Sequence, residues 1–287
     1  MHAWHLRLLR YGVVHPHFSE IVVRLNRTLV ELVPSYLYPS KVIQIQGPKI
    51  AGTAFFPGGS GLYLEGRDSA SVSFPVGGVM IVGHNFDSEF GFKNSLDRGR
   101  EILTKGTWPG LLKRLNCAGI PLCECFFTNA FMGLCEGKAN KGYKGRTDYR
   151  FRTACAAMLK AQVQTQKPTL IVTLGLKAPP LLASLSADLN AWQGRLKQSS
   201  CDPKLTTKDI NKSPILTGRF EFEDGSEHRS VVVPITHPSD ERNVKLRRPT
   251  EFSYGLPGEI ELIREGWTRS RVLELEQVCA RKLLSVN

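Results

Sequence analysis

The sequence predicts an α/β fold with a central, mainly parallel four-stranded sheet that helices cover on both faces. Three observations support this prediction. Four short apolar runs scarcely alternate with polar residues, which is typical of strands buried in a parallel sheet. Helical segments separate several of the runs, and each run passes at once into small or polar residues. The runs end at Gly83, Asn129, Gly175 and Ser239.

The length and composition exclude several classes of protein. The chain has 287 residues, of which 41% are hydrophobic and 22% are charged. These values fit one large globular domain over residues 1–287 and exclude disordered, collagen-like and coiled-coil proteins. No run approaches the roughly 20 apolar residues of a membrane-spanning helix, and the first residues lack the apolar core of a secretion signal.

Charge and cysteine content indicate partners and compartment. The 38 basic and 26 acidic residues give a net charge of +12, which favours a polyanionic partner. Nucleic acid is the first candidate and a membrane surface the second. An odd number of seven cysteines resembles reduced cytoplasmic thiols more than a disulfide framework. We expect a cytoplasmic, nucleoid-associated protein.

The predicted elements follow in chain order. Residues 1–76 form an N-terminal helical and extended elaboration, with an amphipathic helix that begins at Ser19. Residues 77–244 form the core, where the runs "GGVMIVG", "CFFTN", "TLIVTLG" and "VVVPITHPS" are the four strands. A helix from Tyr149 ends before Pro168 because proline cannot continue it.

Two elements complete the predicted fold. Asp224 and Gly225 are a hairpin signal, which places an antiparallel pair at the margin of the sheet. Residues 257–287 have the pattern of a C-terminal helix that packs on the sheet.

Ligands of open α/β sheets bind outside the carboxyl ends of the strands, so the polar residues after each run are the candidate site. The first run leads into Asn85, Asp87 and Glu89, interleaved with phenylalanines. Asn129 ends the second run, and His237 follows the fourth. Taken one at a time, these residues also fit a surface turn, a turn asparagine and a structural histidine; their convergence favours a site. The interleaved aromatic residues are Phe86, Phe90 and Phe92.

A basic loop lies between the second and third runs. Its cations include Lys141, Lys144 and Arg146, with glycines and tyrosines among them. Such a loop suits contacts with phosphate groups, and a solvated surface loop is the alternative.

Taken in this order, the motifs "VGHNFD", "FFTN", "PTLIVTLGLKA" and "THPSDERN" resemble those of the uracil-DNA glycosylase superfamily, over about residues 77–244. The resemblance implies a three-layer α/β/α fold and a monomeric, monofunctional DNA glycosylase. Such an enzyme flips a pyrimidine nucleotide and hydrolyses its N-glycosidic bond, leaving an abasic site. DNA is the implied partner, with no membrane, metal or other cofactor.

The resemblance also implies roles for individual residues. Asn85 positions water, Asn129 reads the pairing edge of the flipped base, and His237 bonds a base oxygen. Ser239 presses on the DNA backbone, and Arg242 or Asn243 fills the gap that the nucleotide leaves. One of the phenylalanines stacks on the base, with Phe92 preferred. The basic loop contacts phosphate.

Departures from the family pattern bear on the substrate. Phe86 replaces the proline after the catalytic asparagine, and Asp87 replaces a residue that shapes selectivity at the 5-position of the pyrimidine. Asp87 therefore fits either a general base or, with Glu89, a group that recognises a sugar. Some bacterial members of the superfamily are thought to excise glucosylated hydroxymethylcytosine from phage DNA. A modified cytosine and uracil are equally weighted substrates.

The cysteines bear on whether the protein holds an iron-sulfur cluster. Relatives with an iron-sulfur cluster use four cysteines, and Cys135 and Cys155 lie near two of those positions. No cysteine precedes Cys117, so we expect no cluster.

The competing function is a non-catalytic DNA-binding or damage-sensing protein on the same fold. A nucleotide-binding oxidoreductase is disfavoured because no G-x-G-x-x-G follows the first run.

Overall fold

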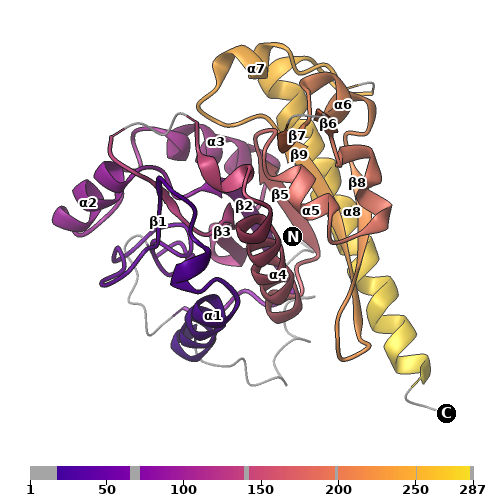
Figure 1. Cartoon of the computed structure of the whole chain (residues 1–287). Coiled ribbons are helices and arrows are strands. Elements are labelled where there is room, and N and C mark those ends of the chain that lie inside the picture. Colours follow the sequence, from indigo (N-terminus) through magenta and orange to yellow (C-terminus); the bar gives the residue numbers. More distant parts are fainter. Residues whose placement is uncertain (1–17, 65–71, 139–141, 198–199, 250, 285–287) are drawn as a thin grey trace.

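A computed structural model describes residues 18–64, 72–138, 142–197, 200–249 and 251–284. Its centre is a five-stranded sheet with the strand order β3-β2-β5-β9-β8 (Figure 1). Four of these strands run parallel, and β8 is antiparallel to β9 at the edge. The strands are β2 (Val79–Asn85), β3 (Cys125–Phe131), β5 (Leu170–Leu174), β8 (Leu216–Glu221) and β9 (Glu227–Ile235).

This sheet confirms an α/β fold with a mainly parallel sheet, but the predicted number of four strands is wrong. The four apolar runs are the four parallel strands. The fifth strand, β8, is the first arm of the predicted hairpin, and the turn to β9 contains Gly225 in the left-handed region with φ of 75°. Because β8 is an edge strand with alternating burial, its apolar content is too low to stand out as a run.

Helices lie on both faces of the sheet, and alternate strand residues point to opposite faces. In β2, Met80 and Val82 belong to one apolar cluster, whereas Val79 and Ile81 belong to the other. The first cluster contains residues of α1 (Phe18–Leu32), α4 (Tyr149–Gln166) and α5 (Pro179–Ala183). The second contains residues of α3 (Thr107–Ala118) and α8 (Gly255–Leu284) (Figure 1).

The predicted helices are present, with small shifts at their ends. At the start of α4, the carboxylate of Asp148 accepts a 2.8 Å hydrogen bond from the backbone N–H of Phe151. This N-cap fixes the first turn. The helix ends at Gln166, and Lys167 adopts a left-handed conformation just before Pro168. The predicted C-terminal helix begins two residues early, at Gly255.

Short elements complete the described chain. A segment from Ala54 to Leu62 runs beside β3, where the N–H of Phe56 donates to the carbonyl of Phe127 at 2.9 Å. This contact brings Phe55 to the carboxyl edge of the sheet. The other elements are η2 (Ser35–Leu37), β1 (Val42–Ile43), α2 (Glu89–Asp97), η4 (Leu122–Glu124), β4 (Leu134–Cys135), η5 (Lys144–Arg146), η6 (Ala187–Trp192), β6 (Arg195–Lys197), β7 (Ser200–Lys204), α6 (Thr207–Lys212) and α7 (Glu241–Lys245).

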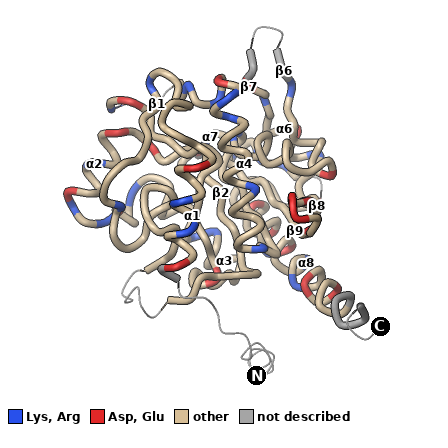
Figure 2. The backbone as a smooth tube through the Cα atoms, turned by 60° about the horizontal axis from the view of Figure 1, so that its bottom comes forward, with Lys and Arg blue, Asp and Glu red and all other residues tan. Residues whose placement is uncertain are grey.

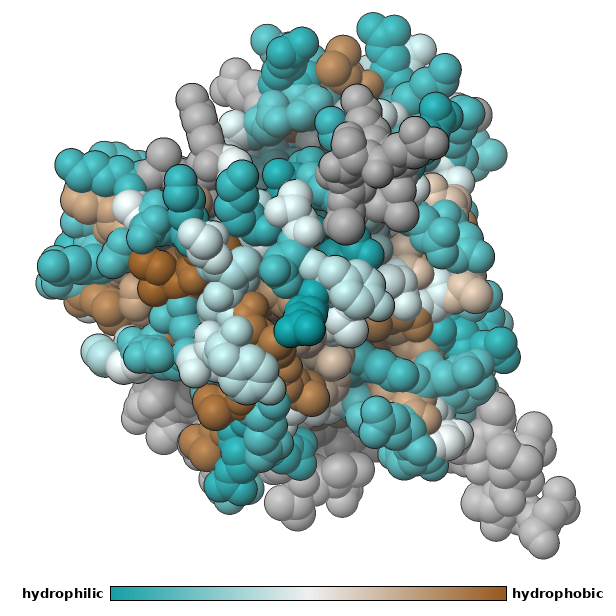
Figure 3. Space-filling view, viewed as in Figure 1, coloured by the Kyte–Doolittle hydropathy of each residue, from teal (hydrophilic) through white to brown (hydrophobic). Residues whose placement is uncertain are grey.

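The face seen in Figure 1 is mostly hydrophilic. Figure 3 shows hydrophilic side chains over much of this face, with apolar side chains gathered in smaller areas. Basic residues lie on the β6 and β7 hairpin in Figure 2, where Arg195 and Lys204 are exposed.

Of the helices that the structure describes, none is both long enough and apolar enough to cross a membrane.

Candidate active site

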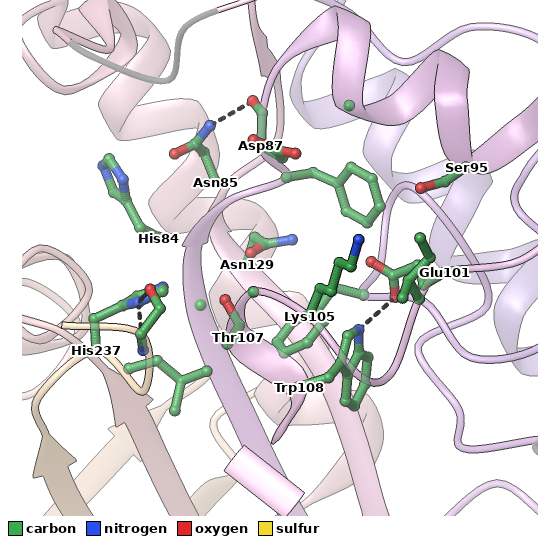
Figure 4. Close-up of a pocket in the computed structure, with 18 of the residues that line it drawn as sticks. His84, Asn85, Asp87, Ser95, Glu101, Lys105, Thr107, Trp108, Asn129 and His237 are labelled. Atoms are coloured by element: carbon green, nitrogen blue, oxygen red, sulfur yellow. Dashed lines mark hydrogen bonds between the residues drawn. The ribbon is translucent and has the colours of Figure 1, made fainter. Parts of the chain in front are cut away.

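A cavity of about 580 Å³ opens at the carboxyl ends of the parallel strands (Figure 4). Asn85 from the end of β2, Asn129 from β3 and His237 just after β9 all line it. The structure thus brings together the polar residues of three predicted strand ends. Parallel strands make this possible because their carboxyl ends share one edge of the sheet.

Asn85 and Asp87 form a tight turn after β2. The Nδ2 of Asn85 donates a 3.0 Å hydrogen bond to the carbonyl of Asp87, whose own N–H donates to the carbonyl of Asn85. Asp87 has φ of 69°, a conformation that aspartate tolerates better than most residues. The N–H of Cys135 in β4 also donates to the Asp87 carbonyl at 3.0 Å. These bonds fix the backbone of the turn at the mouth of the cavity.

The carboxyl group of Asp87 lies against the first turn of α2. Its Oδ2 lies in the space that a Cβ at position 91 would occupy, so Gly91 makes room for it. Burial raises the pKa of Asp87, and a hydrogen bond from the N–H of Ser88 partly offsets this rise. A carboxyl group with a raised pKa can accept a proton more readily than an exposed aspartate.

Asn129 is held with one end of its amide fixed. Its Nδ2 donates a 3.0 Å hydrogen bond to the carbonyl of Phe56, and its side chain is buried. Gly83 of β2 lies directly opposite Asn129 in the sheet. A Cβ at Gly83 would lie 2.5 Å from the Oδ1 of Asn129, so only glycine leaves room for this orientation.

His237 is held by its own turn. The Oγ of Ser239 lies 2.8 Å from Nδ1 of His237, and the backbone N–H of Ser239 also donates to Nδ1 at 3.4 Å. Because Nδ1 accepts the backbone bond, the proton of the neutral ring lies on Nε2. Burial lowers the pKa of His237, which keeps the ring neutral at physiological pH. The ring is therefore a neutral hydrogen-bond donor in the cavity lining.

His84 is a second histidine in the lining. Its ring makes edge contacts with Phe131 and Tyr143, each with centroids 5.4 Å apart. Burial, reinforced by the positive charges of Arg146 and Lys177, lowers the pKa of His84 to about 3. Its Nε2 has no hydrogen-bond partner among the described residues. This histidine stays neutral over the physiological range of pH.

The opposite side of the cavity is a polar annex, defined here by Asn94, Ser95, Glu101 and Lys105. Figure 4 shows Asn129 between His84 and His237 on one side and Ser95, Glu101 and Lys105 on the other. Glu101 accepts a 3.0 Å hydrogen bond from the indole Nε1 of Trp108. Burial raises the pKa of Glu101 to about 7, and the negative charge of Asp87 adds to this effect.

Aromatic residues form the apolar part of the lining. Phe86 lines the cavity, whereas Phe92 is buried beside it in an edge contact with centroids 5.6 Å apart and does not line the cavity. Phe90 is 48% exposed on α2. Phe55 and Trp108 also line the cavity, with centroids 5.3 Å apart. Phe86, Phe55 and Trp108 are therefore the aromatic rings that a ligand in the cavity would meet.

The other predicted contact residues lie around the opening or away from it. Glu89 is exposed and accepts a 3.2 Å hydrogen bond from the N–H of Gly137. Arg242 is exposed on α7, and the side chain of Asn243 is bonded to the N-cap Asp240. Ser239 is exposed at the rim and lines the cavity.

The basic loop divides into different environments. Lys141 lies outside the described residues, and Lys144 is exposed on η5. Arg146 forms a 2.9 Å ion pair with Asp202 of β7, and its side chain is only 17% exposed. This ion pair commits Arg146 to the β6 and β7 hairpin.

Arg247 is another basic residue whose side chain bonds within the protein. It is fully buried and donates hydrogen bonds to the carbonyl of Pro234 at 2.9 Å and to Oδ1 of Asn211 at 2.8 Å. Its bonds tie the chain after α7 to β9.

In the described part of the chain, no group of three or more His, Cys, Asp or Glu side chains is placed to hold a metal ion.

Comparison with known families and proteins adds no assignment. No protein-family model matches the chain, and no curated protein matches it. The resemblance to the uracil-DNA glycosylase superfamily therefore rests on the ordered motifs described above.

Sequence reasoning missed much of the lining. Phe55, Glu101 and Trp108 lie in segments outside the four strand ends. Of these, Glu101 had a detectable signal, since an isolated acid next to the apolar pair Ile102 and Leu103 suggests a partly buried carboxyl group. The aromatic residues had none, because buried core and cavity lining have the same composition.

Proposed function

We propose that this protein is a monofunctional DNA glycosylase that flips a pyrimidine nucleotide into the cavity and hydrolyses its N-glycosidic bond. One observation carries the proposal: Asn85, Asn129 and His237, from three separate motifs, line one cavity. The motifs resemble those of the uracil-DNA glycosylase superfamily in their order along the chain. The net charge of +12 supports a polyanionic substrate.

Base recognition falls to Asn129 and the aromatic lining. The Nδ2 of Asn129 is bonded to the protein backbone, so Oδ1 is the atom that accepts a hydrogen bond from an N–H of the base. Phe55, Phe86 and Trp108 offer rings on which a flipped base stacks. Stacking and one fixed amide together orient the base within the cavity.

His237 stabilises the departing base. When the bond between C1′ and the base nitrogen breaks, its electron pair stays with the base, and negative charge gathers on the base oxygen. The neutral ring of His237 donates Nε2–H to that oxygen. A fixed donor aimed at a developing charge lowers the barrier because it needs no rearrangement during the reaction.

Asn85 and Asp87 act on the water. The amide of Asn85 orients a water molecule toward C1′, where its oxygen forms the new bond to the sugar. The water gives up one proton, which passes to the carboxylate of Asp87 or to the departing base. The raised pKa of Asp87 suits a group that takes up a proton at this step. The products are a free base and an abasic site.

The polar annex bears on the substrate. A cavity of about 580 Å³ lies within the range of roughly 300–1,000 Å³ that holds drug-sized ligands, and a bare pyrimidine is smaller than such ligands. Glu101, Ser95, Asn94 and Lys105 supply acceptors and donors in the same space. This supports a cytosine with a polar 5-substituent, such as glucosylated hydroxymethylcytosine, over uracil. A role in phage defence follows from that substrate.

The test is release of free base, measured by mass spectrometry. Three DNAs carry uracil, 5-hydroxymethylcytosine or glucosylated hydroxymethylcytosine. The proteins are the wild type, Asn85→Ala and the control Asn116→Ala, which removes an exposed asparagine of α3. We expect release of the glucosylated base by the wild type and the control, and none by Asn85→Ala. DNA binding by all three proteins should have the same dependence on salt concentration.

Each other outcome changes a stated part of the proposal. Release of uracil alone keeps the glycosylase and rejects the modified base. Release of no base from any of the three DNAs, with DNA binding intact, rejects the glycosylase in favour of the DNA-binding or damage-sensing alternative.

A further inference from the structure

A buried ion pair joins the two helices on one face of the sheet. Arg114 of α3 and Glu259 of α8 are 3% and 0% exposed. The Nε and Nη2 atoms of Arg114 donate to the same oxygen, Oε2 of Glu259, at 2.9 and 2.8 Å. Burying two charges is costly, and replacing such a pair with apolar residues is often neutral or stabilising. Its contribution to stability therefore gives only a weak reason for its presence.

The second oxygen of Glu259 is bonded to the strand that leads into the site. Oε1 accepts two hydrogen bonds of 2.6 Å from Thr236, one from the backbone N–H and one from Oγ1. Thr236 is fully buried and directly precedes His237. One carboxylate thus fixes both the peptide and the side chain immediately before the predicted catalytic histidine.

The pair also holds α3 close to the turn after His237. Nη1 of Arg114 donates a 2.9 Å hydrogen bond to the carbonyl of Gly110 in the same helix. At Gly110, a Cβ would lie 2.6 Å from the carbonyl oxygen of Pro238, so glycine allows α3 to touch this turn. Thr107 and Trp108, in the first turn of α3, line the cavity.

We propose that Arg114 and Glu259 are positioning residues that hold the His237 turn against α3 and so fix where the imidazole meets the substrate. The inference rests on the proposed function. Neither side chain lines the cavity, so both act through Thr236 and through α3. The pair joins two parts of the lining, His237 on one side and Trp108 on the other.

Other charged groups also act on the His237 ring. The carboxylate of Asp240, two residues after Pro238, raises the pKa of His237, and the positive charge of Arg114 lowers it. The ring of His84 also interacts electrostatically with His237. Removing Arg114 and Glu259 together leaves the net charge of the protein unchanged, because the pair is neutral overall.

The main variant is Arg114→Met with Glu259→Leu, which replaces the pair by apolar side chains. The matched control is Arg271→Met with Glu124→Leu, which removes a 2.7 Å ion pair that ties α8 to η4 elsewhere. Three measurements are made: thermal melting, the steady-state kinetics of base release (kcat and KM), and the imidazole ¹⁵N spectrum. The spectrum distinguishes the two ring tautomers, and His237→Gln identifies the His237 signals among those of seven histidines.

We expect the main variant to melt close to the wild-type temperature while kcat falls at least tenfold and KM changes little. The His237 signals should show a mixture of tautomers, whereas the control keeps the wild-type spectrum and kcat. The inference is overturned if the main variant has a wild-type tautomer and a wild-type kcat. It is also overturned if kcat falls only in proportion to lost folded protein.

Two provisions keep the test decisive. If the main variant does not fold, Thr236→Val decides, because it removes only the Oγ1 hydrogen bond to Glu259; a wild-type His237 spectrum in that variant overturns the inference. If the wild type releases no base, the proposed function fails, and the tautomer spectrum still tests whether the pair positions His237.

Discussion

The indole Nε1 of Trp108 donates a 3.0 Å hydrogen bond to Oε2 of Glu101 in the lining of the cavity. The two residues belong to different elements, since Trp108 is in the first turn of α3 and Glu101 precedes that helix. Burial raises the pKa of Glu101 to about 7, although the hydrogen bond from Trp108 lowers it. At neutral pH a share of this carboxyl group is protonated, so it can donate as well as accept a hydrogen bond.

Stability should therefore depend on pH through Glu101. The folded protein holds this proton more tightly than the unfolded chain, whose carboxyl pKa is near 4.5. The resulting stabilisation is complete below pH 4.5 and is lost as the pH rises through about 7. We expect Glu101→Gln to gain on the order of 2 kcal/mol relative to wild type between pH 5 and pH 8.5.

Urea unfolding at the two pH values measures this difference. The control is Glu136→Gln, an exposed glutamate outside the cavity lining. An equal change in unfolding free energy for Glu101→Gln and wild type across this range would contradict the prediction.

Gly83→Ala should displace the amide of Asn129. The new Cβ would lie 2.5 Å from Oδ1, and Asn129 is tied to the carbonyl of Phe56. We expect a loss of roughly 1–3 kcal/mol in unfolding free energy from overpacking. Base release under single-turnover conditions should fall at least tenfold because the amide no longer meets the base.

The matched control is Gly218→Ala on the edge strand β8. There the new Cβ would lie 3.1 Å from the side chain of Leu189, far along the sheet from β2. A Gly83→Ala protein that releases base at the same rate as Gly218→Ala would argue against a role for Asn129 in base recognition.

Ser239→Ala should weaken the hold on the His237 ring. The variant removes the 2.8 Å hydrogen bond to Nδ1 and leaves only the longer one from the backbone N–H. A hydrogen bond of this kind contributes about 0.5–1.5 kcal/mol, so kcat should fall by about twofold to thirteenfold. The control is Ser226→Ala, which removes a serine bonded to Asp224 in the hairpin turn. Equal rates for the two variants would mean that Ser239 does not hold the ring.

Lys144 and Arg242 should contact phosphate groups, since both are exposed. Each replacement by alanine should reduce the slope of log affinity against log salt concentration by about 1. Arg229→Ala is the control, because this exposed arginine lies near the amino end of β9, away from the cavity edge. Fluorescence anisotropy titrations at several salt concentrations give the slopes. Slopes that match the control would place the DNA elsewhere on the protein.

The sequence predicted most of the sheet because the relevant signal is local. The first four residues of β2, Val79 to Val82, are all apolar and buried, as a doubly covered strand requires. It placed β8 only in a hairpin at the margin of the sheet, because an edge strand with alternating burial has no apolar run. Between β7 and β8 lies α6, whose Thr206 and Asp209 form a capping box. That motif is local and could have been recognised.

Basic residues show where a local signal misleads. Arg114 and Arg247 look like surface cations in the sequence, but both are buried. The partner of Arg114, Glu259, lies 145 residues further along the chain. No pattern within a helix identifies such a pairing, because it depends on how α3 and α8 pack on the sheet.

The sequence by itself determined that the chain forms a mainly parallel α/β sheet and that Asn85, Asn129 and His237 lie at or near the carboxyl ends of its strands. Strand character and chain order fix these features, and both are encoded locally. Only the tertiary structure decided which other groups reach the cavity, how Asn129 and His237 are oriented, and that Phe92 is buried beside Phe86 rather than in the lining. These features depend on contacts between distant segments, whose packing is set by the whole fold.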